Sequence, residues 1–301
     1  MPSSLRLGYA LAALIVAIWT GFIVVSRLGG TGHLTPFDVV AIRLGTAALL
    51  VLPLWLRGMR RLDGPIAALT LTGGLGYTML AYSGFHLAPA AHAGILMTGS
   101  QPLTMALCAW AVTGERPSPR RWAGIAIIIL GGTALSWSAF GHGLSTWPGD
   151  LMFLGASLCW ALYTVLARRW AVSPLDVTVN VAVLAAALYL PVYAVALPKH
   201  IAAASPGEIV LQALYQGALA AVIQMVIYMR AVELLGPTRM GMLVALVPIL
   251  AAFAAMPILH EPVTAALAVS MVLVSAGVLV GNAGPRAPRP ALDRPLCAEE
   301  G

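Results

Sequence analysis

The stretch Thr35-Pro36-Phe37-Asp38-Val39 returns about 140 residues later as Ser173-Pro174-Leu175-Asp176-Val177, with the proline, aspartate and valine in the same register. Proline is common where a helix begins, so each copy predicts the start of a helix. The apolar run after each copy is roughly 20 residues long, enough to cross the hydrocarbon core of a bilayer. The stretch therefore predicts two equivalent membrane helices in a chain made of two similar halves.

Three further residue pairs repeat in the same order on either side of this stretch. Trp19 and Arg27 are eight residues apart, as are Trp160 and Arg168. Pro102 and Glu115 are 13 residues apart, as are Pro248 and Glu261. Glu115 and Gly131 are 16 residues apart, as are Glu261 and Gly277. Four ordered matches at similar offsets exceed what chance supplies, so the sequence predicts an internal duplication.

The composition excludes an ordinary soluble protein. The 301 residues are 60% hydrophobic and 9% charged, whereas about 25% of a soluble domain is charged. Such a chain has too few polar groups to cover a surface in water, so its solvent is lipid. The net charge of +6 comes with no basic helix or aromatic-basic motif, and it indicates cytoplasmic loops and no nucleic-acid partner.

Ten apolar stretches are long enough to be membrane spans. We expect them at residues 7–26, 36–56, 65–86, 90–112, 122–140, 149–168, 177–197, 208–231, 237–258 and 263–282. The links between them are short, which leaves no room for a large soluble domain. Residues 284–301 are rich in Pro, Arg and acidic residues and are expected to form a disordered cytoplasmic tail.

Basic residues set the expected orientation. With a cytoplasmic N-terminus, thirteen arginines fall on the cytoplasmic side and only Arg27 and Lys199 fall outside, so both termini are predicted to be cytoplasmic. Five spans per half is an odd number, so the second half enters the membrane from the opposite face. The predicted fold is an all-α membrane protein of ten transmembrane helices, with inverted five-helix repeats at residues 1–141 and 147–283 around a central cavity. Inverted repeats are typical of secondary transporters that work by alternating access.

The most distinctive motifs are Pro102 with Thr113-Gly114-Glu115-Arg116-Pro117, and Pro248 with His260-Glu261-Pro262. With these motifs, residues 7–283 resemble the EamA-type members of the drug/metabolite transporter superfamily. The Trp, Tyr and Met content of the spans is most similar to that of YddG-type exporters of aromatic amino acids. The resemblance implies a bacterial inner-membrane transporter, surrounded by lipid, that exports aromatic or hydrophobic amino acids or similar small metabolites.

Other functions remain open at this point. Drug-like amphiphiles, purines and hydrophilic amino acids fit the same motifs. The inverted repeat favours a carrier over a pore, and the sequence has no HExxH, GxSxG, paired membrane aspartates or Cys/His dyad that would favour an enzyme. The three cysteines form no CxxC or Cys/His cluster, so neither a cofactor nor a metal is expected. Monomer and homodimer are equally compatible with the sequence.

The acidic residues all lie at span ends, in links or in the tail, so no carboxylate is available at the middle of the membrane for a proton relay. This favours a neutral or zwitterionic substrate. Arg43 is the most unusual charge, because it lies well inside the second expected span. Its guanidinium is either an anion contact or a structural group, paired with a carbonyl or with Asp38 or extended toward the interface.

Uncharged polar and aromatic side chains inside the spans are the expected substrate contacts, because amides, hydroxyls and rings suit an amphipathic ligand. The family architecture implies that they line one cavity. The predicted substrate-binding residues are Trp19, Tyr77, Tyr82, Met97, Thr98, Gln101, Trp160, Thr164, Gln224, Tyr228 and Met242. Pro102 and Pro248 are expected to kink their helices and to act as hinges. His92, near the outer end of its span, is either a titratable switch or a hydrogen-bonded helix-end residue.

Overall fold

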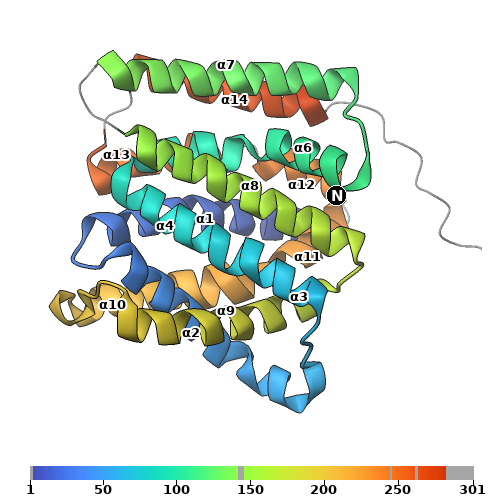
Figure 1. Ribbon diagram of the computed structural model, residues 1–301. Helices are drawn as coiled ribbons and strands as arrows, with labels where there is room; N and C mark the ends of the chain where they lie inside the picture. Colours follow the sequence, from blue (N-terminus) through green and yellow to red (C-terminus); the bar gives the residue numbers. More distant parts are fainter. Residues whose placement is uncertain (1–2, 142–145, 245, 262–263, 283–301) are drawn as a thin grey trace, which may run out of the picture.

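The structure, a computed structural model, describes residues 3–141, 146–244, 246–261 and 264–282. The predicted tail at residues 284–301 lies outside them. The described residues are helical with no strand (Figure 1). Within the described part of the chain, six helical segments are long and apolar enough to cross a membrane: Ser4–Thr31, Pro36–Met59, Ala90–Thr113, Trp147–Arg169, Pro174–Ala196 and Pro206–Leu235.

The first half of the chain runs from α1 to α7. Its elements are α1 (Ser3–Thr31), α2 (Pro36–Leu54), the π-helical η1 (Trp55–Met59), α3 (Gly64–Leu69), η2 (Thr70–Gly76), α4 (Tyr77–Leu87), α5 (Ala90–Ala93), η3 (Gly94–Gly99), α6 (Gln101–Thr113) and α7 (Pro119–Gly141). The second half comprises α8 (Trp147–Arg169), α9 (Pro174–Ala196), η4 (Ile201–Ala203), α10 (Pro206–Gln212), η5 (Ala213–Ile223), α11 (Gln224–Leu235), α12 (Pro237–Val244), α13 (Val247–Leu259) and α14 (Ala265–Asn282).

The repeated stretch begins a helix in both halves, as predicted. The Thr35 hydroxyl accepts a hydrogen bond from the Asp38 N–H, and the Asp38 carboxylate accepts one from the Thr35 N–H, which closes a capping box. Ser173 likewise accepts a hydrogen bond from the Asp176 N–H at the start of α9. Because proline lacks an N–H, its position directly after each cap leaves no extra donor unsatisfied.

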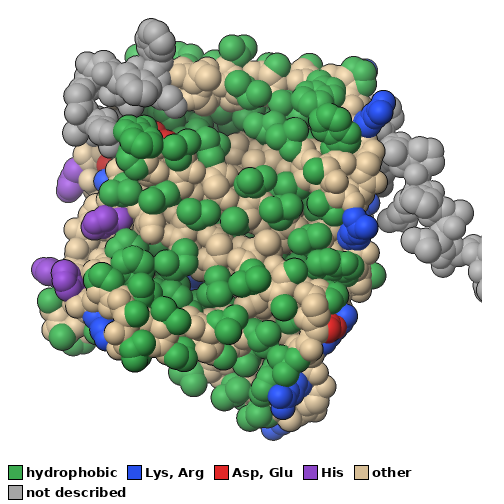
Figure 2. Space-filling view, viewed as in Figure 1, with side chains coloured by type: hydrophobic (Ala, Val, Ile, Leu, Met, Phe, Trp, Pro, Cys, Tyr) green, Lys and Arg blue, Asp and Glu red, His purple; other side chains and the backbone are tan. Residues whose placement is uncertain are grey.

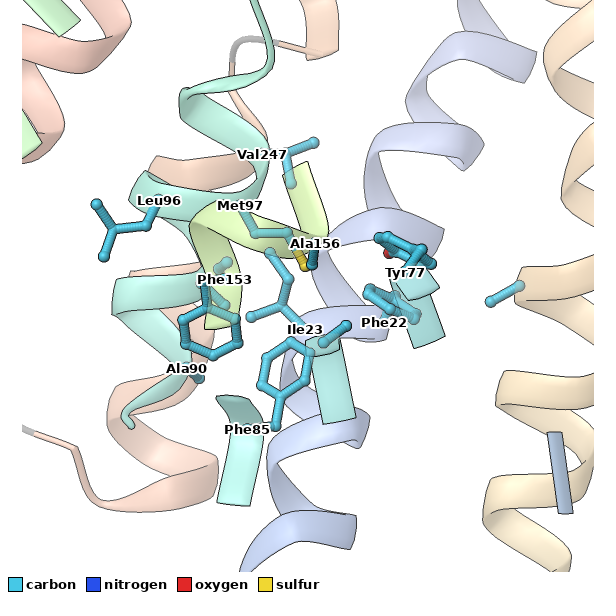
Figure 3. Close-up of a cluster of buried hydrophobic side chains, with 14 of the residues drawn as sticks. Phe22, Ile23, Tyr77, Phe85, Ala90, Leu96, Met97, Phe153, Ala156 and Val247 are labelled. Carbon is cyan, nitrogen blue, oxygen red and sulfur yellow. The ribbon is translucent and has the colours of Figure 1, made fainter. Parts of the chain in front are cut away.

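The helices pack across the two halves. α1 lies against α11 and α13 of the second half, and α8 lies against α4 and α6 of the first half. The last helices of the two halves, α7 and α14, run side by side along one edge of the bundle (Figure 1). α2 and α9 pair at the opposite edge (Figure 1). Large apolar side chains fill the centre, where Phe22, Ile23, Phe85 and Phe153 lie together (Figure 3).

Glycines allow α7 and α14 to approach closely. A Cβ atom on Gly124 would lie 2.6 Å from the carbonyl oxygen of Gly277 and 2.8 Å from the Cα of Gly281. The reverse holds for Gly277, whose Cβ would lie 2.7 Å from the Gly124 carbonyl oxygen. These small residues therefore serve packing within one chain.

Gly124→Ala is expected to lower the free energy of unfolding by about 1–3 kcal/mol, because the added methyl group would collide with the α14 backbone. Gly132→Ala, on the same helix, is the matched control, since its Cβ meets nothing nearer than Leu96 Cδ2 at 3.6 Å. Thermal unfolding in detergent measures both variants. A midpoint for Gly124→Ala equal to that of the control would contradict the expected clash.

The two ends of the bundle differ in charge. Most of the visible Lys and Arg side chains lie at one end, and the His side chains lie at the other, with hydrophobic surface between them (Figure 2). We call the first the arginine-rich end; it comprises the start of α1, the links after η1 and α6, and the end of α8. The opposite end, where α1 ends and α5 begins, is called the histidine end.

Candidate functional site

A cavity of about 340 Å³ enters the bundle from the arginine-rich end. Its mouth is lined by the exposed side chains of Glu115, Arg121 and Arg168. Its inner part is lined by side chains from both halves, including Trp19 of α1 and Tyr228 of α11. A volume of this size suits a small organic ligand.

A smaller chamber of about 60 Å³ continues the cavity inward, since Trp19, Thr98 and Gln101 line both spaces. The chamber ends against Phe22, Arg43 and other residues of both halves. Its remaining walls come from Tyr77, Met97, Trp160, Ala220 and Gln224. Its surface therefore combines aromatic rings, two side-chain amides and one guanidinium.

The two tryptophans of the internal repeat are held by neighbouring side chains. Trp19 Nε1 donates to Gln224 Oε1 at 2.5 Å, and its ring stacks on Tyr228 with 5.8 Å between ring centroids. Trp160 packs on Tyr77 with 5.1 Å between centroids. Each indole thus has a fixed orientation beside the chamber, which favours recognition of a flat, amphipathic ligand.

Arg43 of α2 is buried, and one nitrogen of its guanidinium is hydrogen-bonded to other residues of the protein. Its Nη1 donates to the Gln216 carbonyl oxygen at 3.1 Å and to Tyr82 Oη at 3.3 Å, and the guanidinium lies 5.7 Å from the centroid of the Phe22 ring. Both hydrogen bonds found for Arg43 among the described residues use Nη1, and the residue also lines the 60 Å³ chamber. Neither hydrogen bond uses Nε or Nη2, so these donors are available to a ligand in a space that Arg43 lines.

Asp38 is not the partner of Arg43. Its carboxylate accepts hydrogen bonds from Tyr193 Oη at 2.6 Å and from the backbone N–H groups of Thr35 and His200. The carbonyl that Arg43 contacts comes instead from the second half of the chain.

A buried polar cluster lies behind Arg43. Tyr82 Oη donates to Gln216 Oε1 at 2.9 Å, and Gln216 Nε2 donates to Ser26 Oγ at 2.9 Å. Tyr82 and Gln216 are both almost fully buried. This cluster holds the guanidinium in place. Tyr82 contacts the Arg43 side chain and lines neither the cavity nor its inner chamber.

The predicted substrate-binding residues lie together around the cavity. Those that line it or its inner chamber are Trp19, Tyr77, Met97, Thr98, Gln101, Trp160, Thr164, Gln224 and Tyr228. Met242 belongs to α12, but its side chain lies outside the described residues. Sequence reasoning missed Phe22 and Met105, which line the cavity, and it did not place the repeated residues Glu115 and Arg168 at the mouth. Among the described residues, no group of three His, Cys, Asp or Glu side chains could hold a metal ion.

Pro102 and Pro248 occupy the same position in their spans. Each lies in the first turn of the second helical segment, α6 or α13, directly after a break in the span. Both also line the cavity. Gly94 of η3 lies against Pro248, since a Cβ there would be 3.2 Å from the Pro248 Cα. The two broken spans therefore meet beside the cavity.

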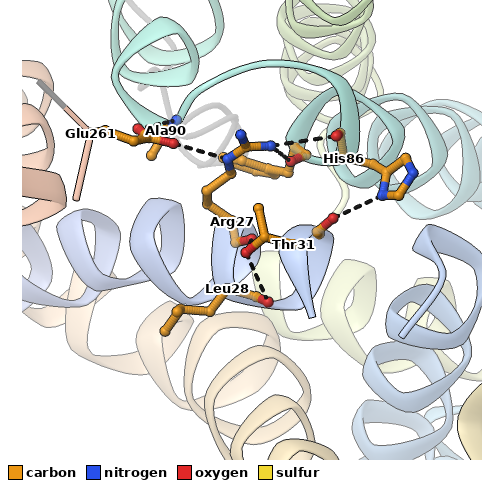
Figure 4. Close-up of polar contacts among 8 residues, drawn as sticks. Arg27, Leu28, Thr31, His86, Ala90 and Glu261 are labelled. Atoms are coloured by element: carbon orange, nitrogen blue, oxygen red, sulfur yellow. Dashed lines mark hydrogen bonds and ion pairs between the residues drawn. The ribbon is translucent and has the colours of Figure 1, made fainter. Parts of the chain in front are cut away.

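Polar contacts join the helices at the histidine end. Arg27 Nε lies 2.9 Å from Glu261 Oε1, and Arg27 Nη1 donates to the Phe85 carbonyl oxygen at 2.6 Å (Figure 4). His92 Nδ1 lies 2.8 Å from Asp150 Oδ1, and both side chains are largely buried. Sequence reasoning had left the role of His92 open, and the structure gives it a carboxylate partner on α8.

Comparisons with known proteins agree on the type of protein. The EamA-like transporter family model matches residues 6–137 and 147–282. A curated relative, the aromatic amino acid exporter YddG of Ancylobacter novellus, is 32% identical over 168 residues, which is 52% of this chain and 58% of the relative. The match thus spans little more than half of that relative. A solved crystal structure has a TM-score of 0.63 at 21% identity, covering 93% of this chain and 97% of that one, which shows likeness of fold alone.

Proposed function

Because the chain belongs to the EamA-like transporter family, we propose that it exports amino acids with aromatic or other hydrophobic side chains across the bacterial inner membrane. The single observation that carries this proposal is the chamber that ends at Arg43. A zwitterionic amino acid would place its carboxylate against the free edge of the guanidinium. Its side chain would lie between Trp19 and Trp160, and Gln101 or Gln224 would accept hydrogen bonds from its ammonium group.

The name of the curated relative supports the same substrate class, since that protein is called an aromatic amino acid exporter. The charge of the site supports a zwitterion over a cation, because the described chamber lining contains a guanidinium and no carboxylate. A permanent cation would be repelled there.

We further propose ten membrane spans arranged as two inverted five-helix repeats, residues 1–141 and 147–283. The packing supports this arrangement, because several of its main helix pairs recur when the halves are exchanged. The α1 contacts with α11 and α13 correspond to the α8 contacts with α4 and α6, and α2 pairs with its equivalent α9. Exchange of equivalent contacts is what an alternating-access mechanism requires of inverted repeats.

The arginine-rich end is proposed to face the cytoplasm, which places both termini there. The excess of basic residues in the links at that end supports this orientation. The cavity then opens toward the cytoplasm, where an exporter collects its substrate, and the histidine end is closed.

Flux into proteoliposomes tests the proposal. Labelled Trp and Phe are expected to show saturable uptake and counterflow, and Thr is expected to be transported less well because it cannot stack on the tryptophans. Liposomes without protein are the control. Absence of saturable flux with every amino acid would overturn the substrate class, and saturable flux of a purine or a drug-like amphiphile would replace it. Flux without saturation or counterflow would indicate a pore.

A further inference from the structure

The ion pair between Arg27 and Glu261 joins the two halves at the histidine end. Arg27 lies near the end of α1, and Glu261 follows α13. The Glu261 carboxylate also accepts a hydrogen bond from the Ala90 N–H at the start of α5, at 2.9 Å (Figure 4). The two side chains are only 17% and 16% exposed. Partial burial and several charge-assisted hydrogen bonds make this pair stronger than an ordinary surface ion pair.

The same two residue types occupy equivalent positions at the arginine-rich end. Arg168 follows Trp160 by eight residues near the end of α8, as Arg27 follows Trp19 in α1. Both tryptophans line the inner chamber, so the two arginines extend from equivalent points toward opposite ends of the bundle.

The two glutamates also share a local backbone structure. Gly114 caps the C-terminal end of α6 in a left-handed conformation with φ of 74°, and Glu115 follows it. His260 caps the C-terminal end of α13 with φ of 55°, and Glu261 follows it. Residues other than glycine rarely adopt a left-handed φ. Because His260 adopts one at the position equivalent to Gly114, we infer that the same chain reversal is needed at both sites.

The two pairs differ in one respect in this structure. Arg27 and Glu261 are in contact, whereas Arg168 and Glu115 are exposed, line the open mouth of the cavity, and form no ion pair with each other among the described residues. The cavity reaches the end with the separated pair, and neither the cavity nor its inner chamber is lined by residues of the end with the formed pair.

We propose that Glu115 and Arg168 form the ion pair that closes the arginine-rich end, and that this pair forms as the Arg27–Glu261 pair separates. The inference rests on the proposed alternating access but not on which substrate is carried. Because one charge pair is exchanged for a chemically identical one, neither conformation is strongly favoured by the charges themselves. Transport then needs only a modest difference in substrate affinity between the two conformations to shift their populations.

Other charges near Glu115 could compete with Arg168. Arg121 lines the same mouth, and Arg116 is adjacent in sequence. Arg169 points elsewhere, since its guanidinium donates to the Val112 carbonyl oxygen. Arg121 therefore serves as the control position.

Cross-linking tests the proposal without relying on substrate. The native cysteines Cys108, Cys159 and Cys297 are first replaced by Ser. Glu115→Cys and Arg168→Cys are then introduced together, and the protein in liposomes is treated with a short rigid bismaleimide. This reagent spans the distance between the Cα atoms of an Arg–Glu pair better than a disulfide does. The mass of the intact protein measures the reaction, because a cross-link adds one reagent to two thiols whereas separate additions add two. Arg27→Cys with Glu261→Cys, in contact here, is the positive control, and Glu115→Cys with Arg121→Cys is the competing pair.

We expect the 115/168 pair to cross-link, and Glu261→Gln added to it to raise the cross-linking rate about tenfold by weakening the opposite pair. In the chain without the introduced cysteines, Glu115→Arg alone and Arg168→Glu alone are each expected to slow Trp flux. The double variant is expected to recover it. If the 27/261 pair reacts but the 115/168 pair does not, or the rate is unchanged by Glu261→Gln, the proposal is overturned. Cross-linking as expected without amino-acid flux would refute the substrate class alone.

Discussion

Arg43→Met is expected to reduce the kcat/KM for Trp transport about 100-fold or more, the largest effect of any single substitution in the cavity. Methionine keeps most of the length of the side chain but removes the cation. A carboxylate in a chamber of apolar and aromatic walls would then lose its charged partner, which costs several kcal/mol. Arg230→Met is the matched control, because Arg230 pairs with Glu233 on the surface and both side chains are more than half exposed. Transport by this control is expected to be near normal.

A structural role for Arg43 predicts different data. The guanidinium also contacts the Gln216 carbonyl and Tyr82, so Arg43→Met lowers the unfolding temperature to some degree. Tryptamine has the ring of Trp without the carboxylate, and its binding separates the two roles. If Arg43 binds the carboxylate, Arg43→Met weakens Trp binding and leaves tryptamine binding unchanged or stronger. Equal losses for both ligands would show that the residue acts only by shaping the chamber.

Pro248→Ala is expected to lower the turnover number about tenfold with little change in KM. Alanine restores the backbone N–H that proline lacks, so the turn at Leu246 before α13 can become helical, and a straighter, stiffer span resists bending. Pro102→Ala is expected to act in the same direction, because it occupies the equivalent break before α6. Stopped-flow or initial-rate flux measurements at saturating Trp test the change.

Pro257 provides the control for that experiment. It lies in the interior of the same helix, α13, and away from the described cavity lining. Pro257→Ala removes a helix-interior proline without altering the break at Pro248. Equal turnover for Pro248→Ala and the unmodified protein would show that the break shapes the cavity and does not bend during transport.

Much of the helical organisation could be predicted from the sequence, because apolar length and helix-start residues are local properties. Thr35 and Ser173 begin helices as their sequences indicate, and the paired residues of the repeat lie at equivalent places in the two halves. The face of each span that points into the bundle was harder to predict from the sequence. Gln224 and Tyr228 line the cavity, but Gln216 on the same span contacts Ser26 and Tyr82.

The partner of Arg43 could not be predicted, because the Gln216 carbonyl is 173 positions away in sequence. Such contacts depend on how far one helix slides along another, and hydrophobic periodicity does not encode that offset. Pro102 and Pro248 are predicted to kink their spans, and each lies in the first turn of a helical segment within its span. Their action as hinges stays a prediction. Glu115 and Arg168 were present in the repeat pattern from the start. The repeat relates them to Glu261 and Arg27, but the contact between Arg27 and Glu261 could not be predicted, because these two residues are 234 positions apart in sequence.

The close pairing of α7 with α14 has a consequence for biogenesis. Synthesis proceeds from the N-terminus, so α7 leaves the ribosome well before α14, its main packing partner, has been made. During that interval the face of α7 that carries Gly124 lacks its partner, and the nascent chain lacks the contact that joins the last helices of its two halves. Completion of the last helix thus acts as a late assembly step. A chain stopped before α14 would present that groove to the quality-control machinery of the membrane.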